Sequence, residues 1–179
     1  TIEAFVGSRI HDALEWLYRL ARDGRVTTKE ELVQKYQALW EAKWKDEIRV
    51  IKQELEVEHY RSNGQKWVEQ YWDRYQPFDQ GITIDLECKV FIDLPGGGKV
   101  MGYIDRLEKA GNNHFVIHDY KTNGRLPTPH ETENDRQLAL YMLGIQQRYP
   151  DLKKIDLVWH FVRFDEDVWS QRTDEQLQG

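Results

Sequence analysis

The sequence predicts an α/β protein in which a central mixed β-sheet is flanked by helices. Two observations predict this fold class. Apolar residues recur at helical spacing up to about residue 76, and from Ile82 they alternate with a period of two. Near the end of the chain, a helix is followed by a strand that is apolar on both faces, as in a strand buried beside a parallel neighbour. We therefore expect a three-stranded antiparallel meander, extended by a strand that a βαβ crossover adds.

The first helix is expected over about residues 3–22, where apolar side chains recur on one helical face. It should end at Asp23-Gly24, because glycine readily adopts the left-handed conformation that terminates helices. His11 lies at the edge of the apolar stripe. A histidine at such a position is more often a packing residue than a metal ligand.

Residues 28–76 are interpreted as a helical insertion. Thr28 and Glu31 have the spacing of a capping box, in which each side chain bonds the backbone amide of the other residue. We expect a long helical region from there to about Tyr60. Asn63-Gly64 is then expected to break the helical pattern before a shorter helix.

The second half of the chain carries the sheet. Strands are expected at about residues 82–94, 100–109 and 114–122, followed by a polar loop at 122–132, a helix at 133–148 and a final strand at 155–164. The first two strands are joined by a glycine-rich turn, whose glycines lack the spacing of a phosphate-binding loop. The final strand should lie parallel to the third one.

Two aspartates fall at corresponding positions of the second and third strands. If the loop between these strands consists of residues 111–113, Asp105 lies directly opposite Asp119, with Cβ atoms about 4.5–5.5 Å apart. A loop of two or four residues would turn the two carboxylates to opposite faces, because each step in register reverses the faces. The expected convergence of the acids therefore depends on the register.

The composition is typical of one domain with a single core: of the 179 residues, 40% are hydrophobic and 31% are charged. There is no apolar run of about 18 residues, so no membrane span is expected. The first residues lack the features of a signal peptide, so we expect a cytoplasmic location. Cys88 is the only cysteine, which excludes an internal disulfide and a four-cysteine cluster made by this chain alone.

The net charge of −6 is unusual for a protein that binds nucleic acid, since phosphates are usually contacted by a basic surface. A bound divalent cation would reverse the local field, and basic residues can cluster. Arg9, Arg106, Lys121, Arg125 and Arg136 lie within or beside the candidate site segments. The alternative is that these are ordinary solvated side chains.

The ends of the second and third strands carry the residue types of a metal site that cleaves phosphodiesters. Mg²⁺ and Mn²⁺ prefer oxygen ligands, usually carboxylates together with water and substrate phosphate. Asp105 and Asp119 would supply the carboxylates, and Tyr120 its main-chain carbonyl. Lys121 shares a face with Asp119, because strand side chains alternate, and it would orient water or stabilise developing charge. The alternative is an ordinary surface ion pair.

Four short segments are each weak signals, but their order along the chain is specific. They are Gly7-Ser8-Arg9-Ile10-His11, Gly102-Tyr103-Ile104-Asp105-Arg106, Asp119-Tyr120-Lys121-Thr122 and Gln137-Leu138-Ala139-Leu140-Tyr141. Together they resemble the motifs of the PD-(D/E)XK nuclease superfamily. The closest resemblance is to its RecB-like exonuclease branch, which includes the nuclease domains of helicase–nucleases and of CRISPR-associated exonucleases. The first segment matches the G-x-x-x-H motif of that branch, and the last matches its Q-x-x-x-Y motif.

The resemblance implies a restriction-endonuclease-like core and a role for each matched residue. His11 would bind the metal from the first helix. Asp105 and Asp119 would be the metal-binding acids, and Lys121 the catalytic lysine. Some members of the branch hold a 4Fe–4S cluster through four cysteines, which the residues of this chain cannot provide.

Other residues would lie beside the site. Gln137 and Tyr141 share one helical face and would contact DNA or support the core. Arg9, Arg106 and Arg125 are candidates for DNA contact or for support of the site. These assignments follow from the resemblance and from the position of each residue near a motif.

The leading hypothesis is a Mg²⁺- or Mn²⁺-dependent deoxyribonuclease, expected to be an exonuclease in DNA repair, recombination, or phage- or CRISPR-type DNA processing. Its substrate would be DNA, single-stranded or at an end. The alternative is a nuclease-fold module that binds nucleic acid or a helicase partner without cutting, and a third hypothesis is another metal-dependent phosphoesterase. The residues 1–179 are interpreted as a single nuclease domain. Because the chain starts just before the first motif, it is also interpreted as a candidate fragment of a larger protein.

Overall fold

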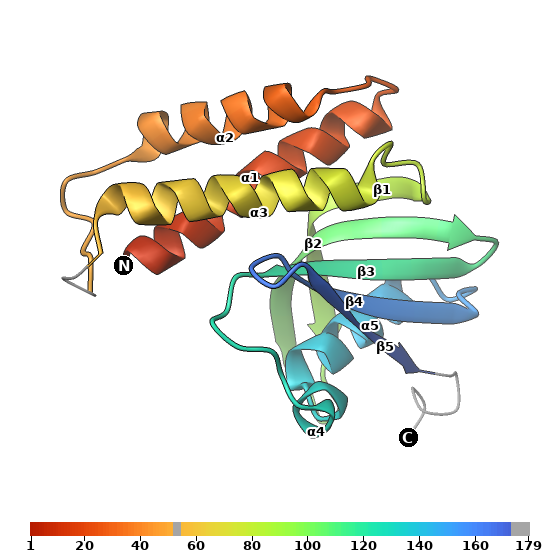
Figure 1. The fold of residues 1–179 in the computed structure, drawn as a ribbon. Coiled ribbons are helices and arrows are strands. Elements are labelled where there is room, and N and C mark those ends of the chain that lie inside the picture. The colour runs from red at the N-terminus through yellow and green to blue at the C-terminus, as the bar shows by residue number, and fades with distance from the viewer. Residues whose placement is uncertain (52–54, 173–179) are drawn as a thin grey trace. The chain divides into compact units, whose positions relative to one another are not determined.

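The computed structural model describes residues 1–51 and 55–172 (Figure 1). It confirms the predicted α/β class, with helices and one mixed sheet of five strands. The chain divides into two compact units, and each is described by itself. Residues 1–79 and 162–166 form a helical unit, and residues 80–161 and 167–172 form a sheet unit. Within the described ranges, no helix is both long enough and apolar enough to cross a membrane.

Three helices make up most of the helical unit: α1 (Ile2–Arg22), α2 (Lys29–Lys43) and α3 (Val57–Tyr75), each in contact with the other two. The expected first helix is confirmed, and Gly24 after it has a φ of 75°, in the left-handed region. The expected capping box is confirmed as well. The Glu31 N–H donates to Thr28 Oγ1 at 3.1 Å, and the Thr28 N–H donates to Glu31 Oε2 at 2.7 Å.

The prediction of one long helix to about Tyr60 is wrong. Helix α2 ends at Lys43, and Trp44 adopts an extended backbone. The Trp44 ring stacks on Trp40 at a centroid distance of 5.7 Å and meets the edge of Phe5 at 5.5 Å. Burying these rings against α1 is a tertiary effect, which helical periodicity alone does not reveal.

The prediction of a helix break at Asn63-Gly64 is also wrong, because α3 runs through both residues. Gly64 lies where α3 approaches α2. A Cβ atom at this position would lie 2.1 Å from the hydroxyl oxygen of Tyr36, which itself donates to the Arg61 carbonyl at 3.1 Å. Glycine is needed here to admit a neighbouring side chain, so it permits packing and does not end the helix.

The sheet runs in the order β1 (Ile82–Asp93), β2 (Lys99–Gly111), β3 (His114–Lys121), β4 (Lys154–Phe161) and β5 (Glu166–Arg172). Strands β1, β2 and β3 form the expected antiparallel meander, and β4 pairs with β3 in parallel, as predicted. The crossover contains the expected helix, α5 (Arg136–Arg148). It also contains a short helix, α4 (Pro129–Glu133), within the segment predicted to be a loop.

Strand β5 was not predicted. The final strand expected at residues 155–164 ends at Phe161, and a turn in which Asp165 has a φ of 50° leads into β5. Val162 and Phe164 of the turn continue the apolar sequence of the strand, so the turn has only a weak sequence signal.

The core of the sheet unit lies between the sheet and α5. Helix α5 packs closely on β1, where a Cβ atom at Gly144 would lie 2.9 Å from Ile92 Cγ1. The buried residues that contribute most to this core include Val90, Leu107, Ile117, Met142, Ile145 and Leu157. This packing holds the meander in place and so positions the ends of β2 and β3.

The loop between β2 and β3 differs from the prediction, although the expected alignment of the acids is retained. Gly111 pairs with His114, so the loop has two residues and not three. A bulge between Lys109 and Gly111 then inserts one extra residue into β2, and Arg106 pairs with His118. The next position in this register sets Asp105 against Asp119. A two-residue loop with a bulge therefore has the effect that was expected of a three-residue loop.

Candidate metal centre

Three acidic residues form a row across neighbouring strands of the sheet unit. Glu87 of β1 lies between Leu86, which pairs with Arg106, and Cys88, which pairs with Ile104, so the register sets Glu87 against Asp105. The β2–β3 register sets Asp105 against Asp119 in turn. Glu87, Asp105 and Asp119 therefore lie at one level of the sheet.

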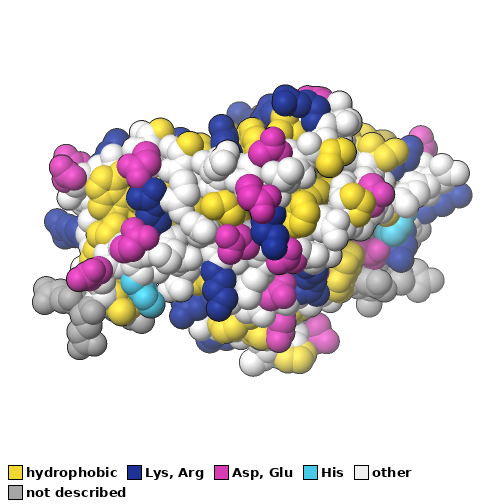
Figure 2. Space-filling view, turned by 45° about the horizontal axis from the view of Figure 1, so that its top comes forward, with side chains coloured by type: hydrophobic (Ala, Val, Ile, Leu, Met, Phe, Trp, Pro, Cys, Tyr) yellow, Lys and Arg dark blue, Asp and Glu magenta, His cyan; other side chains and the backbone are white. Residues whose placement is uncertain are grey.

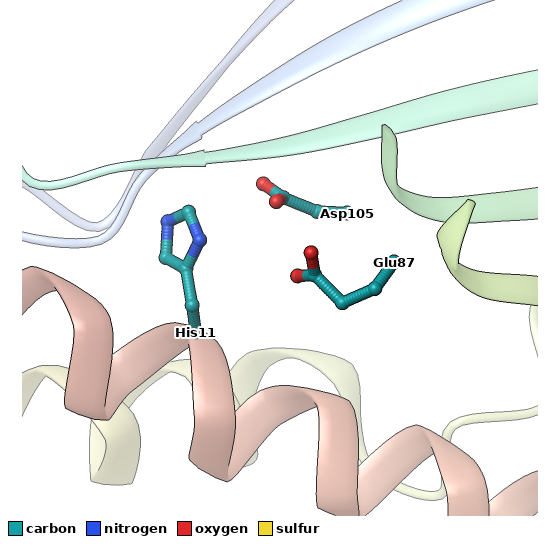
Figure 3. A group of neighbouring side chains, drawn as sticks. All are labelled: His11, Glu87 and Asp105. Atoms are coloured by element: carbon teal, nitrogen blue, oxygen red, sulfur yellow. The ribbon is translucent and has the colours of Figure 1, made fainter. Parts of the chain in front are cut away.

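Glu87 and Asp105 form the more exposed part of the acidic row. Figure 3 shows their carboxylates side by side, and a carboxylate oxygen of Glu87 lies within 4.8 Å of one of Asp105. Glu87 has a φ of 48°, although it lies inside a strand. The left-handed backbone conformation costs a residue other than glycine roughly 1–3 kcal/mol, and strain of this kind is concentrated at functional sites.

Asp105 also reaches β3. The Tyr120 N–H donates to Asp105 Oδ2 at 2.8 Å, directly beyond the last backbone pair, Arg106 with His118. The Asp105 carboxylate thus continues the contact between the strands where their backbone pairing ends. It is fixed by β3 and lies next to Asp119.

Asp119 is the buried member of the acidic row. Burial and, after it, the negative charge of Asp105 raise its pKa from 3.8 to about 6, while Lys121 opposes the shift. The ionised form of Asp119 is therefore electrostatically unfavourable. An additional positive charge between the acids would relieve it.

Lys121 supplies one such charge at the end of β3. Its Nζ lies 2.9 Å from Asp119 Oδ2 and 6.0 Å from the centre of the Trp159 ring on β4. Burial alone would lower the pKa of Lys121, but Asp119, Asp105 and Asp135 together raise it above its ordinary value. Lys121 therefore remains an ammonium group and can donate hydrogen bonds.

Gln137 and Tyr141 lie one turn apart on α5, and the Gln137 Nε2 donates to the Tyr141 hydroxyl at 2.8 Å. Burial raises the pKa of Tyr141, and the charges of Asp119 and Asp105 act in the same direction. A Cβ atom at Gly102 would lie 2.6 Å from Tyr141 Cε1. Because Gly102 has no side chain, the Tyr141 ring can pack directly against the backbone of β2. The Gly102–Arg106 segment and the Gln-x-x-x-Tyr segment are therefore in contact.

The acidic row fits a hard divalent cation. Its side-chain donors are carboxylate oxygens, which Mg²⁺ and Mn²⁺ prefer, and they include a like-charged pair whose ionisation is opposed. Tyr120 presents its backbone at the same level, so its main-chain carbonyl stays a predicted ligand. Oxygen donors of this kind do not distinguish Mg²⁺ from Mn²⁺.

His11 lies on α1, in the helical unit. It follows the buried Ile10 and precedes the buried Ala13 on the apolar side of that helix. Its assignment as a metal ligand stays a prediction from the Gly-x-x-x-His motif.

The three arginines proposed for DNA contact have different surroundings. Arg106 is only 4% exposed and donates to Glu108 Oε2 and to His118 Nδ1, both at 3.1 Å, so of its two predicted roles, DNA contact or support of the site, its surroundings favour support. Arg9 pairs with Asp12 at 2.9 Å within α1 and is also buried. Arg125 is exposed on the loop before α4, where it pairs with both oxygens of Glu131.

Glu87 was missed by the sequence reasoning, as was the buried network around Arg106. A signal for Glu87 was present, since the register argument that set Asp105 against Asp119 also applies to the β1–β2 hairpin. No comparable signal pointed to the buried histidines. His118 and His160 lie on different strands, and their pairing depends on the parallel alignment of β3 and β4.

Comparison with known proteins was made at two levels. Residues 2–178 match the family model described as the PD-(D/E)XK nuclease superfamily. Among curated proteins, none matches the chain significantly. The matched range includes the acidic row, Lys121 and the Gln137–Tyr141 pair.

Proposed function

Because the chain belongs to the PD-(D/E)XK nuclease superfamily, we propose that it is a divalent-metal-dependent deoxyribonuclease that hydrolyses phosphodiester bonds. The observation that carries the proposal is the acidic row Glu87–Asp105–Asp119, with Lys121 paired to its buried member. Carboxylates that can hold a divalent cation, beside a lysine at the end of β3, suit the negative charge that develops during phosphoryl transfer, because the cation and the ammonium group would both neutralise it.

Each residue has a role in this proposal. When bound, Mg²⁺ or Mn²⁺ lowers the pKa of a water molecule and neutralises charge on the phosphate. Asp105 and Asp119 would hold the cation, together with Glu87 and the Tyr120 main-chain carbonyl. The Lys121 ammonium group would donate a hydrogen bond to the attacking water or to a phosphate oxygen, and Asp119 keeps that group in position. His11 is proposed as a further ligand on the strength of its motif.

The finer features of the proposal come from the resemblance to the RecB-like branch. They are exonucleolytic cutting, a single-stranded or terminal DNA substrate, a helicase or other domains of a larger protein as partners, and a role in DNA repair or processing. We also propose a cytoplasmic setting. The one cysteine of the chain, Cys88, is buried, and burial raises the pKa of its thiol to about 11, which favours the neutral thiol.

Cleavage of end-labelled DNA with Mn²⁺ tests the activity. Asp119→Ala and Lys121→Ala should each lower the rate by about 10²–10³-fold. Asp93→Asn is a matched control, since it removes an exposed carboxylate from the same sheet and should leave the rate unchanged. Equal rates for wild type, Asp119→Ala and Lys121→Ala would overturn the assignment.

A second function, a module that binds without cutting, is favoured by the charge distribution. The net charge is −6, and Figure 2 shows acidic and basic side chains interspersed over the face that it draws. Calorimetric titration with Mn²⁺ distinguishes the two functions. A nuclease should lose its Mn²⁺ affinity in Asp105→Asn, whereas a module that does not cut need not bind the ion through Asp105.

A further inference from the structure

The face of the β1–β2 hairpin that bears Glu87 and Asp105 continues beyond them. In the β1–β2 register, Lys89 pairs with Tyr103 and Phe91 pairs with Met101. Side chains on one face of a strand recur every second residue, and paired residues share a face. These four residues therefore lie on the same face as the metal-binding pair. We call this surface the hairpin face: Lys89, Phe91, Met101 and Tyr103.

The hairpin face is unusually apolar for an exposed surface. Phe91 is 59% exposed, Tyr103 49% and Met101 48%. The opposite face of the same hairpin carries Val90 and Ile92, which are buried. A sheet with one covered face normally presents polar side chains on the other. Aromatic rings at the outward positions are therefore not explained by the core, and an exposed patch of this kind marks an interaction site.

The spacing of the two rings suits a flat ligand. Phe91 pairs with Met101, and Tyr103 lies two residues after Met101 on the same strand. Phe91 and Tyr103 are therefore diagonal neighbours across the hairpin. Diagonal neighbours lie about 7–8 Å apart, which is the space that one planar ring needs when it stacks between two others. Nucleic-acid bases present such π-faces whatever their sequence.

Positive charge accompanies the rings. Lys89 Nζ lies 5.2 Å from the centre of the Phe91 ring, and Lys99 lies at the far end of the hairpin, 3.8 Å from Asp93. An aromatic ring with an adjacent ammonium group is the combination that single-strand-binding surfaces use, with rings for the bases and cations for the phosphates. The acids at the other end would be neutralised by the metal ion.

We propose that the hairpin face is a binding track for single-stranded DNA, whose bases stack on Tyr103 and Phe91 and whose phosphates lie along Lys89 toward Glu87 and Asp105. This inference rests on the proposed nuclease function and makes its substrate more specific. The bases of a duplex are already stacked on one another and cannot enter between the two rings. The track therefore selects a single strand, or a frayed end, over a continuous duplex.

The test is the binding of a fluorescein-labelled oligodeoxythymidylate in EDTA, measured by fluorescence anisotropy, so that no cleavage occurs. Tyr103→Ala and Phe91→Ala should each weaken binding about tenfold, since stacking contributes about 1–3 kcal/mol per base. Tyr103→Phe should retain the affinity, because the ring remains. Ile82→Ala is the matched control, as Ile82 is an exposed apolar residue of the same strand outside the hairpin face, and it should bind like wild type.

The outcomes separate the two proposals. If Tyr103→Ala and Phe91→Ala bind the oligonucleotide like wild type while Asp119→Ala has lost cleavage, the track is refuted and the nuclease function stands. If binding depends on both rings but wild type does not cleave DNA with Mn²⁺, the nuclease function is refuted and the track stands. Equal affinity of wild type for the single strand and for a blunt duplex would also overturn the track.

Discussion

Two clusters of ionisable side chains lie on the same strands, one residue apart, and differ in how their charges are balanced. The acidic row contains Glu87, Asp105 and Asp119, and the pKa of Asp119 is raised by burial and by the negative charge of Asp105. The neighbouring residues Arg106 and His118 belong to a buried network in which each charge has a partner. Consecutive residues of a strand point to opposite faces, so adjacent residues can belong to clusters with opposite properties.

The buried network is balanced by its hydrogen bonds. Burial lowers the pKa of His118 well below 6.5, and the charge of Arg106 lowers it further, so the ring is neutral. A neutral ring can accept from Arg106 at Nδ1 and donate from Nε2 to Glu108 Oε2, at 3.0 Å. The network continues to His160, whose Nε2 lies 2.7 Å from His118 Nδ1. The other ring nitrogen of His160, Nδ1, is hydrogen-bonded to Asp167 Oδ1 on β5 at 2.9 Å.

The difference between the two clusters supports the proposal that the acidic row binds a cation. The network satisfies its charges within the protein and so stabilises the sheet. The acidic row has an excess of negative charge, which a cation from solution can neutralise. A polar cluster with this kind of imbalance is a better indicator of function than burial or residue type alone.

Removal of Arg106 is the largest expected effect on stability. Arg106→Met would leave the buried Glu108 carboxylate without its cation, and breaking a buried ion pair in this way costs about 3–5 kcal/mol. Urea denaturation measures the loss. Arg125→Met removes an exposed ion pair and should cost less than about 1 kcal/mol. Similar losses in the two variants would show that the network does not hold the sheet.

Gly102→Ala should cause the next largest loss of stability. The added methyl group would collide with the buried Tyr141 ring, and overpacking of this kind costs about 1–3 kcal/mol. Gly111→Ala, on the same strand, is the control, because nothing lies within 4 Å of a Cβ atom there. Thermal unfolding of the two variants measures the difference. No destabilisation by Gly102→Ala would contradict the packing of the two motifs.

Glu87→Gln tests whether the negative charge at the exposed end of the acidic row contributes to metal binding. The variant should bind Mn²⁺ at least about tenfold more weakly, or ~1.4 kcal/mol, because one charged ligand is lost. Isothermal titration calorimetry gives the dissociation constant. Asp93→Asn removes a carboxylate further along the same strand and should bind Mn²⁺ like wild type. An unchanged affinity in Glu87→Gln would remove Glu87 from the site.

The smallest expected effect is that of Asp119→Asn, which should raise the stability of the folded protein. Because the pKa of Asp119 is raised from 3.8 to about 6, the folded protein keeps a proton that the unfolded chain releases, so stability falls as pH rises from 3.8 to about 6. Asp119→Asn avoids this cost but deprives Lys121 of a partner. In EDTA at pH 7 the variant should be more stable by about 1 kcal/mol, with little gain at pH 4.

The same pair of proteins provides the metal test. Saturating Mn²⁺ should stabilise wild type through binding to the folded state and should stabilise Asp119→Asn much less. Urea denaturation at both pH values, with and without Mn²⁺, measures all four differences. A variant that is less stable than wild type at pH 7 in EDTA would contradict the unfavourable charge of Asp119.

Local patterns predicted those elements that depend on neighbouring residues. The helix of residues 3–22, the Thr28–Glu31 capping box and the alternation of β1 were all evident, because each depends on side chains within a few positions. The parallel β4 was also predictable from its apolar character on both faces. The prediction was wrong at Gly64, because the reason for that glycine is Tyr36 on another helix.

By itself, the sequence determined the fold class and the superfamily, and it predicted Asp105, Asp119 and Lys121 as site residues, because these follow from periodicity and from ordered motifs. The tertiary structure decided the convergence of the acids, because a bulge in β2 compensates for the short loop. It also added Glu87 to the acidic row and placed Arg106 in a buried network. The physical reason is that register and burial are set by contacts between strands, which no single stretch of sequence contains.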